Sequence, residues 1–132
     1  MAVFVDTSAI LAVLDADDAE HGGAAEAWRR ELRAGTSFLT SNYVVVETLA
    51  VVQRRLGLAA TRELVTEVLP ALVVEWVSQA DHAAGMAGLL VAGRKRLSFV
   101  DCTSFELMRR LGIDRAFGFD RHFAEQGFDL LA

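Results

Sequence analysis

Short apolar runs alternate with longer segments of helical period along this sequence, and this alternation constrains its fold more than any other feature. The first run, Ala2–Val5, is rich in β-forming residues and lacks the polar alternation of a strand with one face in water. Further strands are predicted at Ser37–Thr40, Leu72–Val77, Arg115–Phe119 and, as a fifth, Phe128–Leu130. Strands that alternate with helices predict an α/β fold with a mostly parallel sheet.

Helices are predicted between the strands, and many have residues suited to their ends. Ser, Thr and Asn side chains accept hydrogen bonds from the free N–H groups of a first turn, and Gly favours the turn that ends a helix. Helices are expected from a cap at Thr7 or Ser8 to Leu14, from Gly22-Gly23 to Ala34, from a cap at Ser41 or Asn42 to Gly57, over Leu58–Leu69 and Gln79–Ala92, and from the cap Ser98 to Gly112.

The length and composition predict one globular domain over residues 1–132. Apolar residues make up 53% of the chain and charged residues 23%, which is enough apolar surface for a core and excludes intrinsic disorder. The longest uncharged apolar stretch, Ala83–Gly93, is too short to span a bilayer, and Asp6 interrupts the N-terminal apolar run. The single cysteine, Cys102, excludes an internal disulfide. We therefore expect a soluble cytoplasmic domain with no membrane partner.

Four acidic residues fall where a core would not place them. Asp6 directly follows the first predicted strand and Asp120 the fourth, and ligands bind at the carboxyl ends of strands in open α/β sheets. Asp101 lies in the first turn of the helix capped by Ser98, among apolar neighbours. Glu47 interrupts an apolar helix face. The four acids are therefore expected to converge on one cleft.

Clustered carboxylates repel one another, and their burial without partners is costly. No basic run lies beside all four acids, so a divalent cation is the simplest compensator, and a set of oxygen ligands favours Mg²⁺ or Mn²⁺. Such a site suits hydrolysis of a phosphodiester. We expect Asp6 and Asp101 to hold the principal cation, with Glu47 and Asp120 completing the site.

Each acid alone also has a structural explanation. The two acids that follow strands suit turns or helix caps, and Asp101 complements a helix dipole. Glu47 has Arg54 and Arg55 as candidate ion-pair partners. The three histidines, His21, His82 and His122, are scattered and form no i, i+4 pair, so we expect no catalytic role for them. Of the three, His122 is the best candidate because it neighbours Asp120.

The net charge of −5 argues against a protein that coats nucleic acid, but the charge is unevenly distributed. Seven of the thirteen basic residues lie after Ala92. Contacts to the phosphates of a nucleic acid are predicted for a basic loop and for a position next to Asp120: Arg94, Lys95, Arg96 and Arg121, with the wider Arg109–Arg121 region contributing.

Four segments together resemble PIN-domain ribonucleases, and more closely the VapC-type toxins of bacterial toxin–antitoxin pairs. They are Val3-Phe4-Val5-Asp6-Thr7-Ser8-Ala9, the helix with Glu47 after Ser41-Asn42-Tyr43, Leu97-Ser98-Phe99-Val100-Asp101-Cys102-Thr103-Ser104-Phe105, and Ala116-Phe117-Gly118-Phe119-Asp120-Arg121-His122-Phe123. The resemblance covers nearly the whole chain in the right order.

This resemblance implies a three-layer α/β/α fold and Mg²⁺- or Mn²⁺-dependent endonucleolytic cleavage of RNA. It matches Asp6, Glu47, Asp101 and Asp120 to the family's acidic quartet, of which Asp120 has the most variable role. Thr7 or Ser8 and Thr103 match supporting hydroxyls. It also implies a homodimer, a cognate antitoxin that blocks the acidic cleft, and larger complexes of the two proteins.

Three alternatives remain open on the sequence. The first is a PIN-like RNA-processing nuclease that is not a toxin. The second is a phosphoryl-transfer or phosphatase-like protein, although Ser8 stands where such phosphatases carry a second Asp, and Lys95 is the only lysine. The third is a non-catalytic interaction module that retains the acidic cleft.

Overall fold

In residues 1–93 and 97–131, which the computed structural model describes, five parallel strands form one sheet. The predicted α/β fold with a parallel sheet is confirmed. The strands follow the order β3-β2-β1-β4-β5 across the sheet. They are β1 (Ala2–Val5), β2 (Ser37–Ser41), β3 (Val73–Glu75), β4 (Arg115–Phe117) and β5 (Asp129–Leu131).

The strand order reverses between β1 and β4. The chain runs outward from β1 through β2 to β3 and returns to place β4 on the other side of β1. Val3 pairs with Phe38 of β2, and Val5 pairs with Phe117 of β4. In open α/β sheets such a reversal leaves a crevice at the carboxyl ends of the two adjoining strands.

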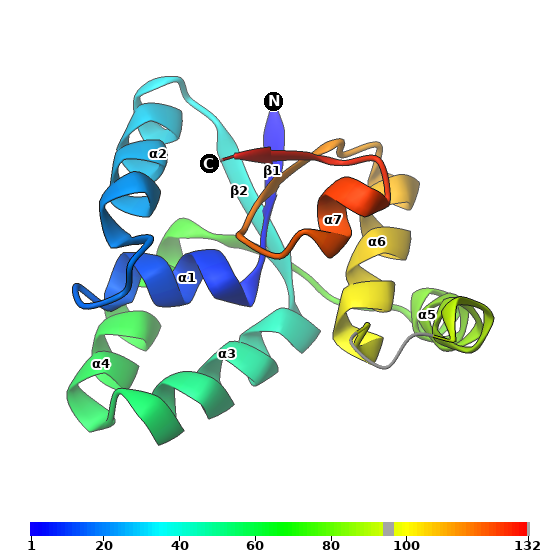
Figure 1. The fold of residues 1–132 in the computed structure, drawn as a ribbon, viewed down its shortest axis with the longest axis horizontal. Coiled ribbons are helices and arrows are strands. Elements are labelled where there is room, and N and C mark those ends of the chain that lie inside the picture. Colours follow the sequence, from blue (N-terminus) through cyan, green and yellow to red (C-terminus); the bar gives the residue numbers. More distant parts are fainter. Residues whose placement is uncertain (94–96, 132) are drawn as a thin grey trace.

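Helices cover both faces of the sheet, in the three layers that the family resemblance implies (Figure 1). One side carries α1, α2, α3 and α4, and the other carries α6 and α7 with α5 packed outside α6. The helices are α1 (Thr7–Leu14), α2 (His21–Arg33), α3 (Asn42–Arg55), α4 (Leu58–Glu63), α5 (Gln79–Ala92), α6 (Phe99–Leu111) and α7 (His122–Glu125).

Two apolar clusters lie on opposite sides of the sheet because successive side chains of β1 alternate between its faces. Val3 and Val5 belong to the cluster that includes Ile10 of α1, whereas Phe4 belongs to the cluster that includes Phe105 of α6. All three β1 side chains are fully buried. Burial on both faces explains why the sequence of β1 has no polar alternation.

The glycine-rich helix α5 packs closely on α6. A Cβ atom built on Gly85 would lie only 2.5 Å from Thr103 Oγ1, so only glycine permits this approach.

Among the described residues, no helix is long and apolar enough to cross a membrane.

Several predicted boundaries were wrong by one or two residues, and two differences have clear causes. The predicted Arg115–Phe119 strand ends at Phe117, because β1 ends opposite it at Val5 and offers no further backbone partner. The predicted Leu58–Leu69 helix changes after Glu63 into a π-helical turn, Leu64–Val68, and then a 3₁₀ turn that contains Pro70. Proline lacks the N–H that an α-helix would need there.

Candidate active site

Asp6 and Asp120 approach each other at the crevice where the strand order reverses. Asp6 directly follows β1 and caps α1, its side chain accepting a hydrogen bond from the backbone N–H of Ser8. The cap predicted at Thr7 or Ser8 was therefore wrong by one or two residues. Asp120 lies in the turn between β4 and α7. It was predicted to follow the strand directly, but β4 ends two residues earlier than predicted, at Phe117.

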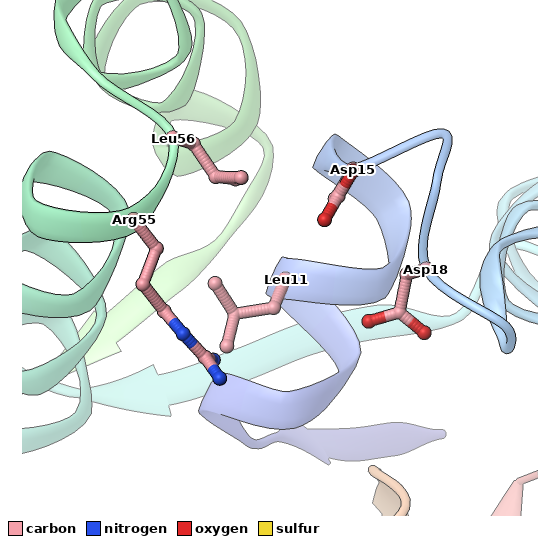
Figure 2. A pocket seen from close by; sticks show the side chains of 5 residues that line it. All are labelled: Leu11, Asp15, Asp18, Arg55 and Leu56. Atoms are coloured by element: carbon pink, nitrogen blue, oxygen red, sulfur yellow. The ribbon is translucent and has the colours of Figure 1, made fainter.

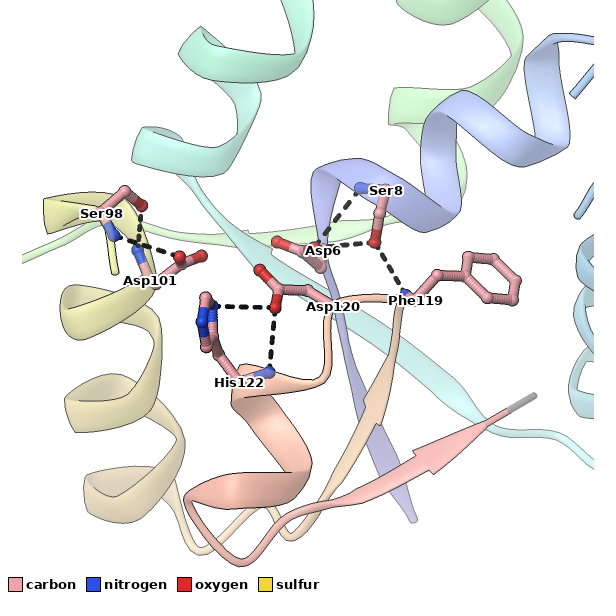
Figure 3. Close-up of polar contacts among 7 residues, drawn as sticks. All are labelled: Asp6, Ser8, Ser98, Asp101, Phe119, Asp120 and His122. Carbon is pink, nitrogen blue, oxygen red and sulfur yellow. Dashed lines mark hydrogen bonds and ion pairs between the residues drawn. The ribbon is translucent and has the colours of Figure 1, made fainter. Parts of the chain in front are cut away.

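Gly118 permits the close approach of this turn to Asp6. A Cβ atom on Gly118 would lie 3.1 Å from Asp6 Cβ and 3.2 Å from Ser8 Oγ. Ser8 also joins the two segments: its hydroxyl donates to Asp6 Oδ2 at 2.9 Å, and its oxygen accepts the N–H of Phe119 at 2.9 Å. The β4–α7 turn is thus held against the end of β1 (Figure 3).

Asp101 reaches the same crevice from the start of α6. It forms a reciprocal capping box with Ser98: the Asp101 N–H donates to Ser98 Oγ, and the Ser98 N–H donates to Asp101 Oδ2. Only 8% of Asp101 is exposed. Figure 3 shows its carboxylate pointing toward those of Asp6 and Asp120. Asp101 therefore caps the helix and also contributes its carboxylate to the cluster.

Glu47 joins the site from α3 and is held by a hydroxyl rather than by an arginine. The Thr7 hydroxyl donates to Glu47 Oε1 at 2.8 Å and also lies 3.0 Å from Thr48 Oγ1. In the part of the chain that the structure describes, neither Arg54 nor Arg55 forms an ion pair with Glu47. The alternative of an exposed ion pair for Glu47 was wrong.

The charges of the four acids influence the pKa values of Asp6 and Asp101. The pKa of Asp6 is raised to about 7, mainly by burial. The hydrogen bonds from Ser8 lower this pKa, whereas the charges of Asp101 and Glu47 raise it further. Burial also raises the pKa of Asp101, and the charges of Asp120 and Glu47 add to this. Carboxylates that are costly to ionise together form a site that favours binding of cations.

The predicted supporting hydroxyls divide into two groups. Thr7 and Ser8 bond directly to acids of the cluster, Glu47 and Asp6 respectively. The Thr103 hydroxyl instead donates to the carbonyl of Phe99 in its own helix and packs against α5. The structure places Thr103 at the contact between α5 and α6, away from the hydrogen bonds that hold the acids.

His122 belongs to the cluster, although sequence reasoning noted only that it neighbours Asp120 and did not include it in the site. One ligand atom from each of Asp101, Asp120 and His122 lies within 4.8 Å of the other two. The His122 backbone N–H donates to Asp120 Oδ1 at 2.9 Å, and its ring Nδ1 lies 3.0 Å from the same oxygen. The position two residues after an acid in a turn was the available signal, since such a side chain returns toward that acid.

Among the described residues of the predicted basic region, three arginines are engaged with acidic or amide side chains. Arg109 bonds to Glu106 and Gln126, Arg110 to Asp81, and Arg115 to Glu31, so the wider Arg109–Arg121 region is mostly engaged within the fold. Arg121 is exposed at the start of α7, next to Asp120. The predicted contacts of Arg94, Lys95 and Arg96 lie outside the described residues.

Two hollows differ in their relation to the acids. An apolar groove beside the cluster shares Glu47 with it and is otherwise lined by Tyr43, Val46, Phe99 and Val100. A separate hollow lies between α1 and the end of α3, lined by Leu11, Asp15, Asp18, Arg55 and Leu56 (Figure 2). None of the four clustered acids lines the second hollow.

Comparison with known proteins agrees with this geometry. Residues 3–129 match the PIN domain family. The chain belongs to the PIN-domain family. It is 35% identical over 127 residues to a Mycobacterium tuberculosis protein described as the 23S rRNA-specific endonuclease VapC20, covering 96% of this chain and 95% of that protein. This likeness places it among the VapC-type PIN domains.

Solved structures show the same relationship. The crystal structure of M. tuberculosis VapC20, described as a sarcin–ricin loop cleaving toxin, matches with a TM-score of 0.84 over 96% of this chain and 95% of that one. FitAcB from Neisseria gonorrhoeae matches at 16% identity with a TM-score of 0.70, over 100% and 97% of the two chains. PAE2754 from Pyrobaculum aerophilum matches at 17% identity with a TM-score of 0.68, over 99% and 90%. The last two show that the PIN fold is shared.

Proposed function

We propose that this PIN-domain protein is a metal-dependent endoribonuclease and the toxin of a toxin–antitoxin pair. The observation that carries the proposal is a group of four convergent acids, of which Asp6 and Asp101 are buried without a cationic partner among the described residues. Full-length likeness to an endonuclease toxin supports the same activity. The phosphoryl-transfer alternative finds no support in the family assignment.

The residues of the cluster fit a hard divalent cation. Carboxylate oxygens are the ligands that Mg²⁺ and Mn²⁺ prefer. Burial and neighbouring acids raise the pKa values of Asp6 and Asp101, so a bound cation would favour their ionised forms. Asp6 and Asp101 would hold the principal ion, and Glu47 and Asp120 would complete the site. When bound, such an ion activates water and stabilises negative charge on the phosphate.

The chain's own contacts keep these acids in position. The Ser8 hydroxyl orients Asp6, the Thr7 hydroxyl orients Glu47, and the capping box orients Asp101. Because these bonds come from the chain itself, they limit how far the acids reorganise during the reaction, which is an advantage for electrostatic catalysis. Thr103 serves the packing of α6 in this scheme.

Arg121 is the described basic residue best placed to contact RNA. It is exposed and adjacent to Asp120, so it would bind a phosphate that flanks the cleavage position. We expect Arg121→Ala to weaken RNA binding a few-fold and to lower the salt dependence of binding by about one counterion. An unchanged slope of binding against salt concentration would remove Arg121 from the RNA contact. Arg94, Lys95 and Arg96 remain proposed contacts.

We propose ribosomal RNA as the substrate class, in the cytoplasm. The support is the 35% identity to VapC20, whose described target is 23S rRNA at the sarcin–ricin loop. A homodimer and an antitoxin that occupies the acidic crevice complete the proposal. The exposed side chain of Val46 lines the groove that contains Glu47, and with exposed Trp76 it lines a second hollow, so both offer apolar surface for such partners.

A cleavage assay on intact ribosomes and on purified 23S rRNA tests the function. With Mg²⁺ or Mn²⁺ we expect one principal cut, mapped by primer extension, that a chelator abolishes. Induced expression in a bacterial host separates a toxin from an RNA-processing nuclease, because a toxin arrests growth and co-expressed antitoxin relieves the arrest. Metal binding without cleavage of any RNA would indicate a non-catalytic module and overturn the proposal.

A further inference from the structure

We propose that His122 is a nitrogen ligand in a second cation position, formed with Asp101 and Asp120, and that this position prefers a first-row transition cation such as Mn²⁺ to Mg²⁺. The inference deepens the proposed function, on which it rests for the presence of cations in the crevice. Sequence reasoning placed only oxygen ligands at this site.

The separations of the ligand atoms suit a cation. Two adjacent ligands of an octahedral ion, each about 2.1 Å from it, lie about 3.0 Å apart. His122 Nδ1 and Asp120 Oδ1 are 3.0 Å apart. An atom of Asp101 completes a group of three within 4.8 Å, so small side-chain rotations bring all three within reach of one ion.

The environment of the ring nitrogen also points to a ligand. His122 Nδ1 is shielded from solvent and makes no hydrogen bond with any described residue, because its direction toward Asp120 does not suit one. A buried polar atom without a partner is costly, and such atoms are rare in folded proteins. The backbone N–H of His122 meanwhile fixes Asp120 Oδ1 beside the ring. A cation between the two would satisfy both atoms.

Asp101 lies between this position and the first one. The charges of Asp120 and Glu47 both act on its carboxylate, whereas the charges of Asp101 and Glu47 act on Asp6. We therefore assign Asp6, Glu47 and Asp101 to one position, and Asp101, Asp120 and His122, whose ligand atoms lie within 4.8 Å of one another, to the other. Paired ions in phosphodiester-cleaving sites lie about 3.5–4 Å apart and share a carboxylate in this way.

The nitrogen donor distinguishes the two positions chemically. Mg²⁺ is hard and prefers oxygen ligands and water, whereas first-row transition cations gain affinity from imidazole. The position with three carboxylates therefore suits Mg²⁺ or Mn²⁺, and the position with His122 suits Mn²⁺.

Pulsed electron paramagnetic resonance of Mn²⁺ bound to the metal-free full chain tests the inference, because it detects nitrogen directly bonded to the ion. We expect a ¹⁴N coupling from one imidazole in the wild type. His122→Gln should remove the coupling and weaken Mn²⁺ binding about tenfold, while Mg²⁺ binding at the other position is retained. The matched control, His21→Gln, should keep the coupling.

A His21→Gln/His82→Gln double variant makes the test independent of how His122→Gln folds. His122 is then the sole histidine of the chain, so a retained coupling assigns the ligand to it. No imidazole coupling in the wild type, or a coupling that survives in His122→Gln, would overturn the inference. Failure of the proposed function looks different, since it is loss of RNA cleavage with every cation while the coupling is present.

Discussion

The protein buries carboxylates in two different ways. Asp81 in α5 is 5% exposed and accepts two hydrogen bonds from Arg110 Nε, at 3.0 and 3.1 Å. Glu31 in α2 is 6% exposed and bonds to Arg115 and Thr36. The side chain of Asp6, equally buried at 5%, accepts hydrogen bonds from Ser8 groups alone among the described residues.

The pKa values follow this difference in partners. Burial raises the pKa of Glu31, but the bonds from Thr36 and Arg115 outweigh it and leave the pKa below its usual value. At Asp6 burial dominates, and neighbouring acids add to it. A buried acid with an arginine therefore stabilises the fold, whereas a buried acid among other acids needs a ligand. Substitution by asparagine, at an acid of the cluster and at an acid paired with arginine, distinguishes these two kinds of buried acid.

Cleavage of RNA should show the largest effect. Asp6→Asn and Asp101→Asn each remove charge that would hold the cation, and we expect cleavage to fall roughly 1,000-fold or more, since the ion contributes several kcal/mol to the transition state. Initial rates on the mapped 23S rRNA site measure this. Asp17→Asn, a change at an exposed loop acid, is the control and should cleave normally. Wild-type activity in either site variant would refute the assignment.

Stability without metal should change in the opposite direction to activity. The carboxyl of Asp6 ionises near 3.8 when unfolded and near 7 when folded, so wild-type stability falls as the pH rises through this interval. Asp6→Asn avoids that loss and keeps an oxygen to cap α1. We expect it to be more stable than wild type by roughly 2 to 4 kcal/mol at pH 8, and by much less at pH 4.

Urea unfolding in the presence of a chelator, across this pH range, measures the difference. Added Mg²⁺ should then stabilise the wild type and leave Asp6→Asn unaffected, because a ligand that binds only the folded state stabilises it. A variant no more stable than wild type at pH 8 would show that the burial of Asp6 carries no cost.

The same substitution at an arginine-paired acid should destabilise the protein. Asp81→Asn leaves Arg110 with Glu75, 3.6 Å away, as its remaining acidic partner. We expect a loss of roughly 1 to 2 kcal/mol, limited because Arg110 is about half exposed and water screens part of the interaction. Thermal unfolding measures it. Equal stability changes at Asp6 and Asp81 would contradict the distinction between the two kinds of acid.

The smallest effect concerns the turn beside Asp6. Gly118→Ala places a methyl group 3.1 Å from Asp6 Cβ, so Asp6 must shift by a few tenths of an ångström. We expect cleavage to fall about tenfold at most, because misplaced groups lose catalytic efficiency. Gly22→Ala meets open space in α2 and should keep full activity with up to about 1 kcal/mol of added stability. Equal cleavage rates of the two variants would show that the turn accommodates a methyl group at Gly118 without displacing Asp6.

The sequence was most informative where local pattern and fold agree. The uninterrupted apolar run of β1 and the cap Ser98 each predicted their element, and acids at strand ends and helix starts indicated a shared crevice. Partners distant in sequence left no pattern. The arginine bound to Asp81 and the shielding of His122 Nδ1 from solvent depend on tertiary packing, which a single sequence does not display.

The bond between Ser8 and the Phe119 N–H joins residues 111 positions apart, and it has a consequence for how the crevice comes into being. Asp6 and Glu47 leave the ribosome early in translation, but Asp101 and Asp120 follow only after most of the chain has been made. Contacts between residues so far apart in sequence form late, together with the rest of the fold, because the intervening chain must first be brought together. A half-made chain therefore holds no assembled crevice, and the host is exposed to the nuclease only once folding is nearly complete.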